Sequence, residues 1–177
     1  MSSLIEPGLH ESRYRAVFGA DFSPSFQQWL EQPGRGALGF RNAAEGPLFL
    51  EHYLDAPVEQ VVSRQLCREL PRSAIVEIGN FAAANAVAMM NLWGEAANDL
   101  ADESEVAVAT LTAPLRTMLR RIGVPVVELA PASSSRLGRR AARWGTYYEQ
   151  DPIVCAGVIA AGQAALARYS RSKAGPQ

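Results

Sequence analysis

Short apolar runs alternate along the chain with longer stretches in which apolar residues recur every three or four positions. This pattern predicts strands alternating with helices. The most informative run spans residues 75–83, where apolar residues flank one carboxylate, Glu77, and a Gly79-Asn80 pair follows. A buried carboxylate is costly unless it is paired or serves a task that needs a shifted pKa. Because glycine inside a strand usually marks a bulge or a close backbone approach, we expect the central strand to break at Gly79-Asn80.

Spacings of three and four residues predict five helices around this strand. The first carries Tyr14, Val17 and Phe18 and ends near Ser23-Pro24. The second opens at Asp55-Ala56-Pro57, with Asp55 as an acidic cap. The other three cover residues 85–100, the segment from Pro114 to the stop signal Gly123, and the alanine-rich residues 156–169. In the helix before Gly123, the pattern predicts that Leu119 faces inward and Arg116 faces outward.

Further apolar runs predict shorter strands, at residues 37–41, 105–111, 124–129 and 144–149. Turns are expected at residues 32–36 and 42–47, and a polar, basic loop at residues 131–143. The alternation indicates a single α/β or α+β domain. No G-x-G-x-x-G motif follows a strand, so a dinucleotide-binding fold is not supported.

Composition narrows the class of protein without naming a function. The 177 residues suit one domain with a real core, and 48% hydrophobic and 20% charged residues are ordinary for a globular protein. A net charge of −1 predicts no general attraction to nucleic acid or anionic membranes. No signal peptide is visible, and no stretch reaches the ~18 apolar residues of a membrane helix. The two cysteines form no disulfide framework, so we expect a cytoplasmic protein. His10 and His52 form no metal-ligand pair, so we expect no metal.

Four segments, in order, resemble the signatures of the thermostable hemolysin family. The first is Leu48–Gln60 and the second is Ile75–Ala82. The third comprises Thr112, Leu115-Arg116, Leu119 and Gly123. The fourth comprises Arg136-Leu137-Gly138, Trp144–Tyr148, Pro152, Val154 and Ala156-Gly157. The resemblance runs from about Arg13 to Gly157, which is most of the chain.

That family is similar to the acyl-homoserine-lactone synthases and, through them, to the GNAT acyltransferase fold. Arg15-Ala16-Val17-Phe18 resembles the first helix of the lactone synthases, and Glu77 with Phe81 resembles their central strand. The resemblance implies a GNAT-like domain over residues 13–169, with a central mixed sheet, a broken central strand and flanking helices. Residues 1–12 would then be an N-terminal extension and residues 170–177 a C-terminal tail.

Two residues are candidates for catalytic roles, and the resemblance supports the first of them. Glu77 would be the general base that deprotonates an amine attacking a thioester, which requires a raised pKa. The structural alternative is a carboxylate paired with an arginine. The common GNAT acid tyrosine is absent, because Leu119 stands in its place. Tyr148 is our candidate for a replacement acid or a substrate contact.

The same comparison implies a site for the acyl donor at the strand break. Backbone N–H groups around Gly79, Asn80 and Phe81 would bind the thioester carbonyl or the pantetheine amides; a plain bulge, or Asn80 as a helix cap, is the alternative. The remaining candidate donor-binding residues are Ala82, Asn85 and Arg116. The usual Arg/Gly-rich pyrophosphate loop is replaced by Ala82–Ala86, so the donor stays open between acyl-CoA and acyl carrier protein as co-substrate, with no tightly bound cofactor.

Arg15, Phe18 and Trp144 are the candidate acceptor-binding residues, with Arg15 suited to a substrate carboxylate. Exposed arginines would contact phosphates or an acidic carrier protein, or would simply form a solvated face. They are Arg116, Arg120, Arg136, Arg139, Arg140 and Arg143.

The function that the resemblance implies is N-acyl transfer from an acyl thioester to a small amine or amino acid. Two alternatives stay open. One is a membrane-active, hemolysin-like protein, for which the helix at residues 156–169 is the best candidate segment. The other is an acyl-thioester binding module without chemistry.

Overall fold

The computed structural model describes residue 19 and residues 26–174. The predicted N-terminal helix, with Arg15 and Phe18, lies outside these residues. Within the described part, six strands form one mixed sheet in the order β1-β2-β3-β4-β6-β5. The strands are β1 (Gln28–Gln32), β2 (Gly36–Asn42), β3 (Ile75–Ala83), β4 (Val106–Leu111), β5 (Val127–Pro131) and β6 (Ile153–Val158).

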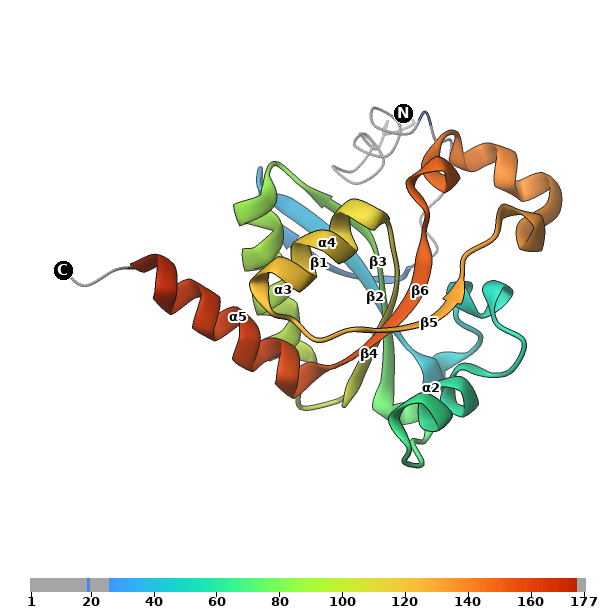
Figure 1. The fold of residues 1–177 in the computed structure, drawn as a ribbon, viewed down its shortest axis with the longest axis horizontal. Coiled ribbons are helices and arrows are strands. Elements are labelled where there is room, and N and C mark those ends of the chain that lie inside the picture. Colours follow the sequence, from blue (N-terminus) through green and yellow to red (C-terminus); the bar gives the residue numbers. More distant parts are fainter. Residues whose placement is uncertain (1–18, 20–25, 175–177) are drawn as a thin grey trace, which may run out of the picture.

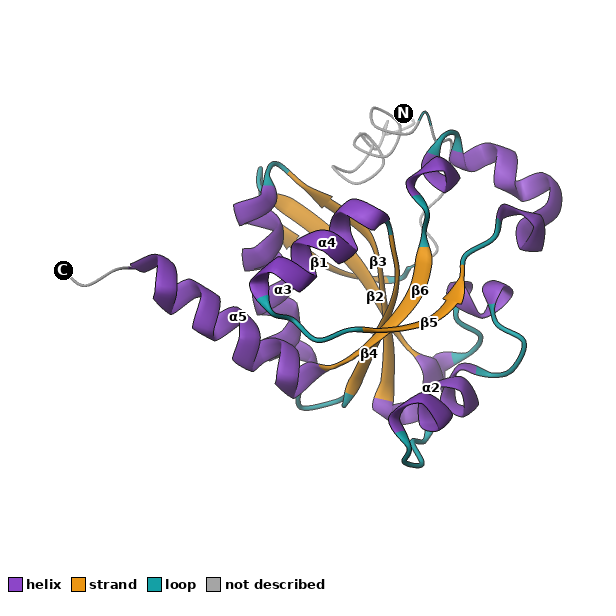
Figure 2. Ribbon diagram, viewed as in Figure 1, coloured by secondary structure: helices purple, strands orange, loops and turns teal. Residues whose placement is uncertain are grey.

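Helices cover both faces of the sheet (Figures 1 and 2). The α-helices are α2 (Val58–Leu66), α3 (Ala86–Leu100), α4 (Ala113–Ile122) and α5 (Ile159–Ala174). Short 3-10 segments are η1 (Ala43–Glu45), η2 (Phe49–Tyr53), η3 (Arg72–Ala74), η4 (Ser134–Trp144) and η5 (Tyr147–Gln150). In Figure 1, α3, α4 and α5 lie together on one side and α2 lies on the other. The predicted α+β domain with a mixed sheet is confirmed.

Each face of the sheet carries its own apolar core, because successive strand residues point to opposite faces. In β3, Ile75 packs into the core under α2, whereas Val76 packs into the core under α3, α4 and α5. The apolar face predicted for the helix after Pro57 is also buried in one of these cores. Val58 and Val62 of α2 are fully buried, which contributes roughly 1.5–3 kcal/mol for each side chain.

β3 extends through Gly79-Asn80 to Ala83, but it carries a bulge at this predicted position and parts from β4 just before it. β3 pairs in parallel with β4 only from Ile75 to Glu77. Beyond Glu77, β3 continues beside β2 while β4 continues beside β6 as far as Leu111, so the two central strands part. Between the pairs Ala37–Ala82 and Gly39–Gly79, β3 has one more residue than β2, which defines a bulge in β3.

Two strands escaped the sequence analysis, and one predicted strand is wrong. Residues 156–158 belong to β6 and not to the alanine-rich helix, which begins at Ile159 and extends to Ala174. β1 is a polar edge strand that carries little apolar signal. The aromatic residues 144–149 form no strand; they end η4 and begin η5, because Gly145 at φ 53° turns the chain between them.

Further corrections concern boundaries and individual side chains. The strand predicted at 124–129 lies at Val127–Pro131, and the predicted loop at 131–143 contains the turns of η4. Asp55 does not cap α2; Pro57 is the cap residue, and Glu51 Oε1 accepts the Val58 N–H at 2.9 Å. Asp55 instead pairs with Arg136. Arg116, expected to face outward, is 8% exposed.

Candidate active site

Glu77 lies at the last residue where β3 and β4 still pair, and its side chain is 4% exposed. Its Oε2 accepts the Phe49 N–H at 2.8 Å and its Oε1 accepts the Leu50 N–H at 3.0 Å. These two N–H groups open the 3-10 segment η2, where a helical turn leaves its first donors unpaired. The carboxylate therefore holds a loop that is remote in sequence against the centre of the sheet.

Burial raises the pKa of Glu77 to about 7, although the Phe49 and Leu50 N–H groups act in the opposite direction. No ion pair to this carboxylate occurs within residues 26–174. The alternative of an arginine-paired structural carboxylate thus has no ion-pair partner in the described part of the chain, although Arg41, opposite Glu77 in β2, acts to lower its pKa. A carboxyl group with a pKa near neutrality is able to accept a proton from a substrate and to release it again.

An aromatic cluster covers the loop that holds Glu77. The Phe49 and Trp144 ring centres are 5.6 Å apart, and those of Trp144 and Tyr147 are 5.3 Å apart. Tyr148 OH lies 2.7 Å from Tyr53 OH. Burial raises the pKa of both hydroxyls. Trp144, predicted from the sequence as a substrate contact, thus lies at the site, and Tyr148 lies in the tyrosine pair beside it.

A small cavity of about 30 Å³ lies at the point where the central strands part. Its polar lining includes Glu77, Asn80, Thr110 and Tyr147, and Tyr53 and Trp144 also line it. Sequence reasoning identified the first two, but it missed Thr110 and Tyr147. Thr110 shares one face of β4 with the buried residues Val106 and Val108, and because Val108 pairs with Glu77, this position could have suggested a polar group on the Glu77 face.

The backbone at the strand break has two unusual features. Asn80 is 6% exposed and adopts φ 53°, a left-handed conformation that only glycine and, less often, asparagine adopt readily. Gly79 is fixed by a close approach, since a Cβ built there would lie 2.7 Å from the Phe26 ring. The donor-binding prediction for backbone groups at Gly79 and Asn80 stays a prediction, but its location coincides with the cavity.

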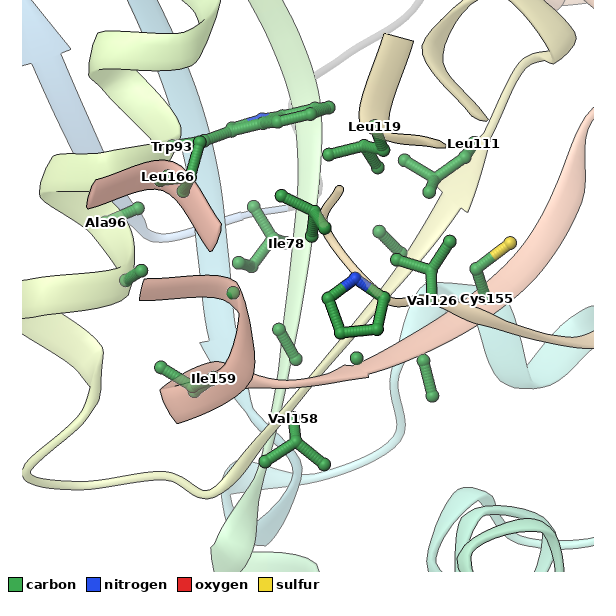
Figure 3. Close-up of a pocket in the computed structure, with 18 of the residues that line it drawn as sticks. Ile78, Trp93, Ala96, Leu111, Leu119, Val126, Cys155, Val158, Ile159 and Leu166 are labelled. Carbon is green, nitrogen blue, oxygen red and sulfur yellow. The ribbon is translucent and has the colours of Figure 1, made fainter. Parts of the chain in front are cut away.

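A second cavity, of about 110 Å³ and apolar, lies on the other face of the sheet. In Figure 3, side chains from the strands (Ile78, Leu111, Cys155) and from the covering helices (Trp93, Leu119, Leu166) surround it. Phe81 also lines this cavity, and its ring centre lies 5.6 Å from that of Trp93. Ile78 lines both cavities, so the two lie on either side of this residue.

Three other predicted donor-binding residues have structural contacts that account for them. Arg116 donates to the carbonyl oxygens of Leu111 at 2.8 Å and Asp151 at 2.5 Å, and it pairs with the Asp151 carboxylate. Asn85 caps α3 by accepting the Ala88 N–H at 2.9 Å. Ala82 is buried in β3 opposite Ala37 of β2. The helix cap is thus Asn85 and not Asn80.

The loop that supplies the N–H groups to Glu77 is fixed by a second glutamate. Glu51 accepts the N–H groups of Leu48 and Val58 and pairs with Arg72 at 2.8 Å. Arg72 also pairs with Glu59 at 2.7 Å and donates to the Ala43 and Gly46 carbonyls. Sequence analysis did not identify this network, because its members are separated along the chain by turns.

No cluster of three or more metal-binding side chains occurs in the part of the chain that the structure describes. The residues that line the site supply one carboxylate, hydroxyl and amide groups, and aromatic and apolar walls.

Comparison with solved structures defines the class of fold. TofI, in a ternary complex with an inhibitor and MTA, matches with a TM-score of 0.60 at 18% identity over 94% of this chain and 91% of that chain. MesI, a CoA-dependent acyl-homoserine lactone synthase, matches at 0.56, with 14% identity over 95% and 87% of the two chains. FeeM, an N-acyl amino acid synthase from uncultured soil microbes, matches at 0.55, with 15% identity over 88% and 90%. The chain has the GNAT-like acyltransferase fold of these proteins.

The family follows from the sequence itself. The thermostable hemolysin family matches residues 9–163, and the chain belongs to this family. A search of curated proteins found no match.

Proposed function

We propose that the protein is an N-acyltransferase that moves an acyl group from a thioester to a small amine or amino acid. The observation that carries the proposal is the position of Glu77. A buried carboxyl group with a pKa of about 7 lies where the two central strands part, beside an apolar cavity. The neighbours of similar fold include an acyl-homoserine lactone synthase and an N-acyl amino acid synthase.

The proposed reaction is a direct attack without a covalent enzyme intermediate. Glu77, directly or through a water, takes the proton from the attacking amine. The gap between β3 and β4 receives the thioester, and the apolar cavity beyond Ile78 accepts the acyl chain. Burial of that chain between the sheet and α3, α4 and α5 contributes binding energy without hydrogen bonds.

The acyl donor is a thioester of coenzyme A or of acyl carrier protein. The segment at residues 82–86 offers small side chains and no arginine, and Arg116 is occupied by Leu111 and Asp151. Other cations therefore contact the donor's phosphates, such as the exposed Arg139 and Arg140 of η4. Trp144, Tyr148 and, from the undescribed segment, Arg15 and Phe18 remain our candidates for contacts with the acceptor.

Mass spectrometry tests the proposal. Purified protein is mixed with acyl-CoA and acyl carrier protein thioesters and a pool of amino acids and amines. A new N-acyl product, absent without protein, is the expected result and names both substrates. If the thioesters bind in a thermal-shift assay but no product forms with any acceptor, the binding-module alternative replaces the enzyme.

The helix that was the candidate membrane-active segment, α5, packs against the core of the protein. In α5, Ile159, Ala165 and Leu166 are buried in the core, so the apolar side of this helix is already covered. None of the described helices combines the length and the apolar character that crossing a bilayer requires. Leakage of dye from liposomes at low protein concentration would nevertheless restore this alternative.

A further inference from the structure

Asn80 combines two features that each disfavour an ordinary structural role. Its backbone is left-handed at φ 53°, and its buried side-chain Nδ2 has no hydrogen-bond partner among the residues that the structure describes. Glycine at this position would remove both unfavourable features, because glycine adopts positive φ freely and has no side chain to desolvate. Backbone strain and unpaired buried donors concentrate at functional sites. Asn80 therefore needs an explanation in terms of a ligand.

The unpaired amide lies in the cavity that also contains the proposed base. Asn80 and Glu77 both line the cavity of about 30 Å³ at the strand break, together with Thr110 from the facing strand. This volume suits one small group, such as a carbonyl or a water. Asn80 lies beyond the last β3–β4 pair, where none of the described strands pairs with β3 on its β4 side.

The chemistry of the cavity selects the kind of group that binds there. An N–H donor requires an oxygen or nitrogen acceptor. An anionic ligand would lie close to the Glu77 carboxylate, and no Lys or Arg lines this cavity in the described part of the chain. A neutral carbonyl oxygen meets both conditions. In acyl transfer, such an oxygen gains negative charge only in the transition state, where a fixed donor in a water-poor site is most effective.

We infer that Asn80 Nδ2 donates a hydrogen bond to the carbonyl oxygen of the acyl thioester and stabilises the oxyanion, a role that rests on the proposed function. The amine nitrogen forms a bond to the carbonyl carbon, and the C=O π electrons move onto oxygen. Glu77 takes one proton from the nitrogen. The oxyanion then collapses, the C–S bond breaks, and the leaving thiolate takes up that proton. An amide and a thiol are the products, and Glu77 is a carboxylate again.

Asn80→Gly is the decisive variant, because it removes the donor and accommodates the left-handed backbone. We expect kcat for medium-chain acyl-CoA or acyl carrier protein thioesters with amino acids to fall about 100-fold or more, with KM nearly unchanged. The melting temperature should stay equal or rise. Cys67→Gly is the matched control, since Cys67 also adopts φ 53° but is exposed at the end of α2. It should leave kcat unchanged.

Asn80→Asp provides a second, shape-conserving variant. It replaces the donor by a carboxylate and places negative charge beside the developing oxyanion, so kcat should fall at least as far as in Asn80→Gly. If the wild type transfers acyl groups and Asn80→Gly keeps kcat within twofold, the inference is wrong and the proposed function stands. If Asn80→Gly loses stability and kcat together, Asn80 is structural, and the inference is again wrong. Absence of transfer by the wild type itself overturns the proposed function and this inference together.

Discussion

Two glutamates that accept backbone N–H groups around the same loop have pKa values shifted in opposite directions. Glu51 accepts the N–H groups of Leu48 and Val58, and Glu77 accepts those of Phe49 and Leu50. Burial acts to raise the pKa of Glu51, but the hydrogen bond from Arg72 and the two backbone N–H groups bring that pKa down to about 2. Burial raises the pKa of Glu77 to about 7, since two N–H groups alone do not offset it.

The difference separates a structural carboxylate from one suited to proton transfer. Glu51 and Arg72 fix the loop, and the loop in turn presents two N–H groups to Glu77. Glu77 is held against the sheet with no ion pair among the described residues, and burial outweighs the opposing effect of Arg41, so its charge can change near neutral pH. Two differences separate the positions: Glu77 is the more deeply buried of the two, and only Glu51 pairs with an arginine.

Removal of the Glu77 carboxylate should have the largest effect. Glu77→Gln keeps the size of the side chain but removes the base, so we expect kcat to fall about 10²–10⁴-fold. Its NH₂ group meets one of the two N–H groups, which should cost about 1 kcal/mol of stability. Steady-state kinetics and urea unfolding measure both. Glu105→Gln, at an exposed glutamate paired with Arg68, is the control, and its kcat should equal that of the wild type. If Glu77→Gln retains full activity, Glu77 is structural.

Removal of the arginine that pairs with Glu51 should lower the free energy of unfolding. Arg72→Ala leaves Glu51 and Glu59 without their cation and frees the Ala43 carbonyl, so unfolding should be easier by about 3 kcal/mol. Urea denaturation checks this value. Arg68→Ala removes an exposed ion pair and should change stability by less than about 1 kcal/mol. Equal losses in the two variants would show that the Arg72 network does not fix the loop.

The two carboxyls should also respond to pH in opposite directions. Glu77 has a folded pKa of about 7 above its ordinary 4.5, so its contribution to stability is complete below pH 4.5 and is lost as pH rises through 7. Between pH 5 and 7 this loss should be about 2 kcal/mol relative to Glu77→Gln. Glu51, with a lowered pKa, loses its contribution only as pH falls from 4.5 toward 2. Urea unfolding of the wild type and of Glu77→Gln between pH 5 and 7 measures the difference. Parallel pH profiles of the two proteins would contradict the assignment.

The smallest effect is expected at an exposed carboxylate. Asp55 pairs with Arg136, but both side chains are largely in solvent and Asp55 caps no helix. Asp55→Asn should therefore change the free energy of unfolding by less than about 0.5 kcal/mol. Thermal unfolding provides the measurement. A loss near 1–2 kcal/mol would restore the helix cap that the sequence suggested.

Elements with a clear period were predictable from the sequence, whereas those defined by their partners were not. The broken strand β3, the strand β4 and the helices α3 and α4 follow from apolar spacing and from breaks at glycine or proline. β6 runs directly into α5 without a turn residue, so the change of period at Ile159 was hidden within an alanine-rich stretch. Arg116 fits the polar side of an amphipathic helix, yet Asp151 from a distant segment pairs with it.

The site was predictable only where a side chain breaks the pattern of its own strand. Glu77 and Asn80 are polar residues inside an apolar run, which makes them visible in the sequence. The groups that Glu77 contacts are backbone N–H groups, and these carry no residue-specific signal. Thr110 and Tyr147 reach the cavity through the arrangement of β4 and η5, which a sequence without its fold does not reveal.

The most direct test of the comparison is a titration of the glutamate carboxyl groups by NMR, with ¹³C-labelled protein. One carboxyl carbon should titrate near pH 7 and be missing from the spectrum of Glu77→Gln, while another should stay ionised down to about pH 2 and shift upward in Arg72→Ala. Titration of Glu77 at or below its ordinary value of 4.5 would contradict the assignment of this residue as a base suited to neutral pH.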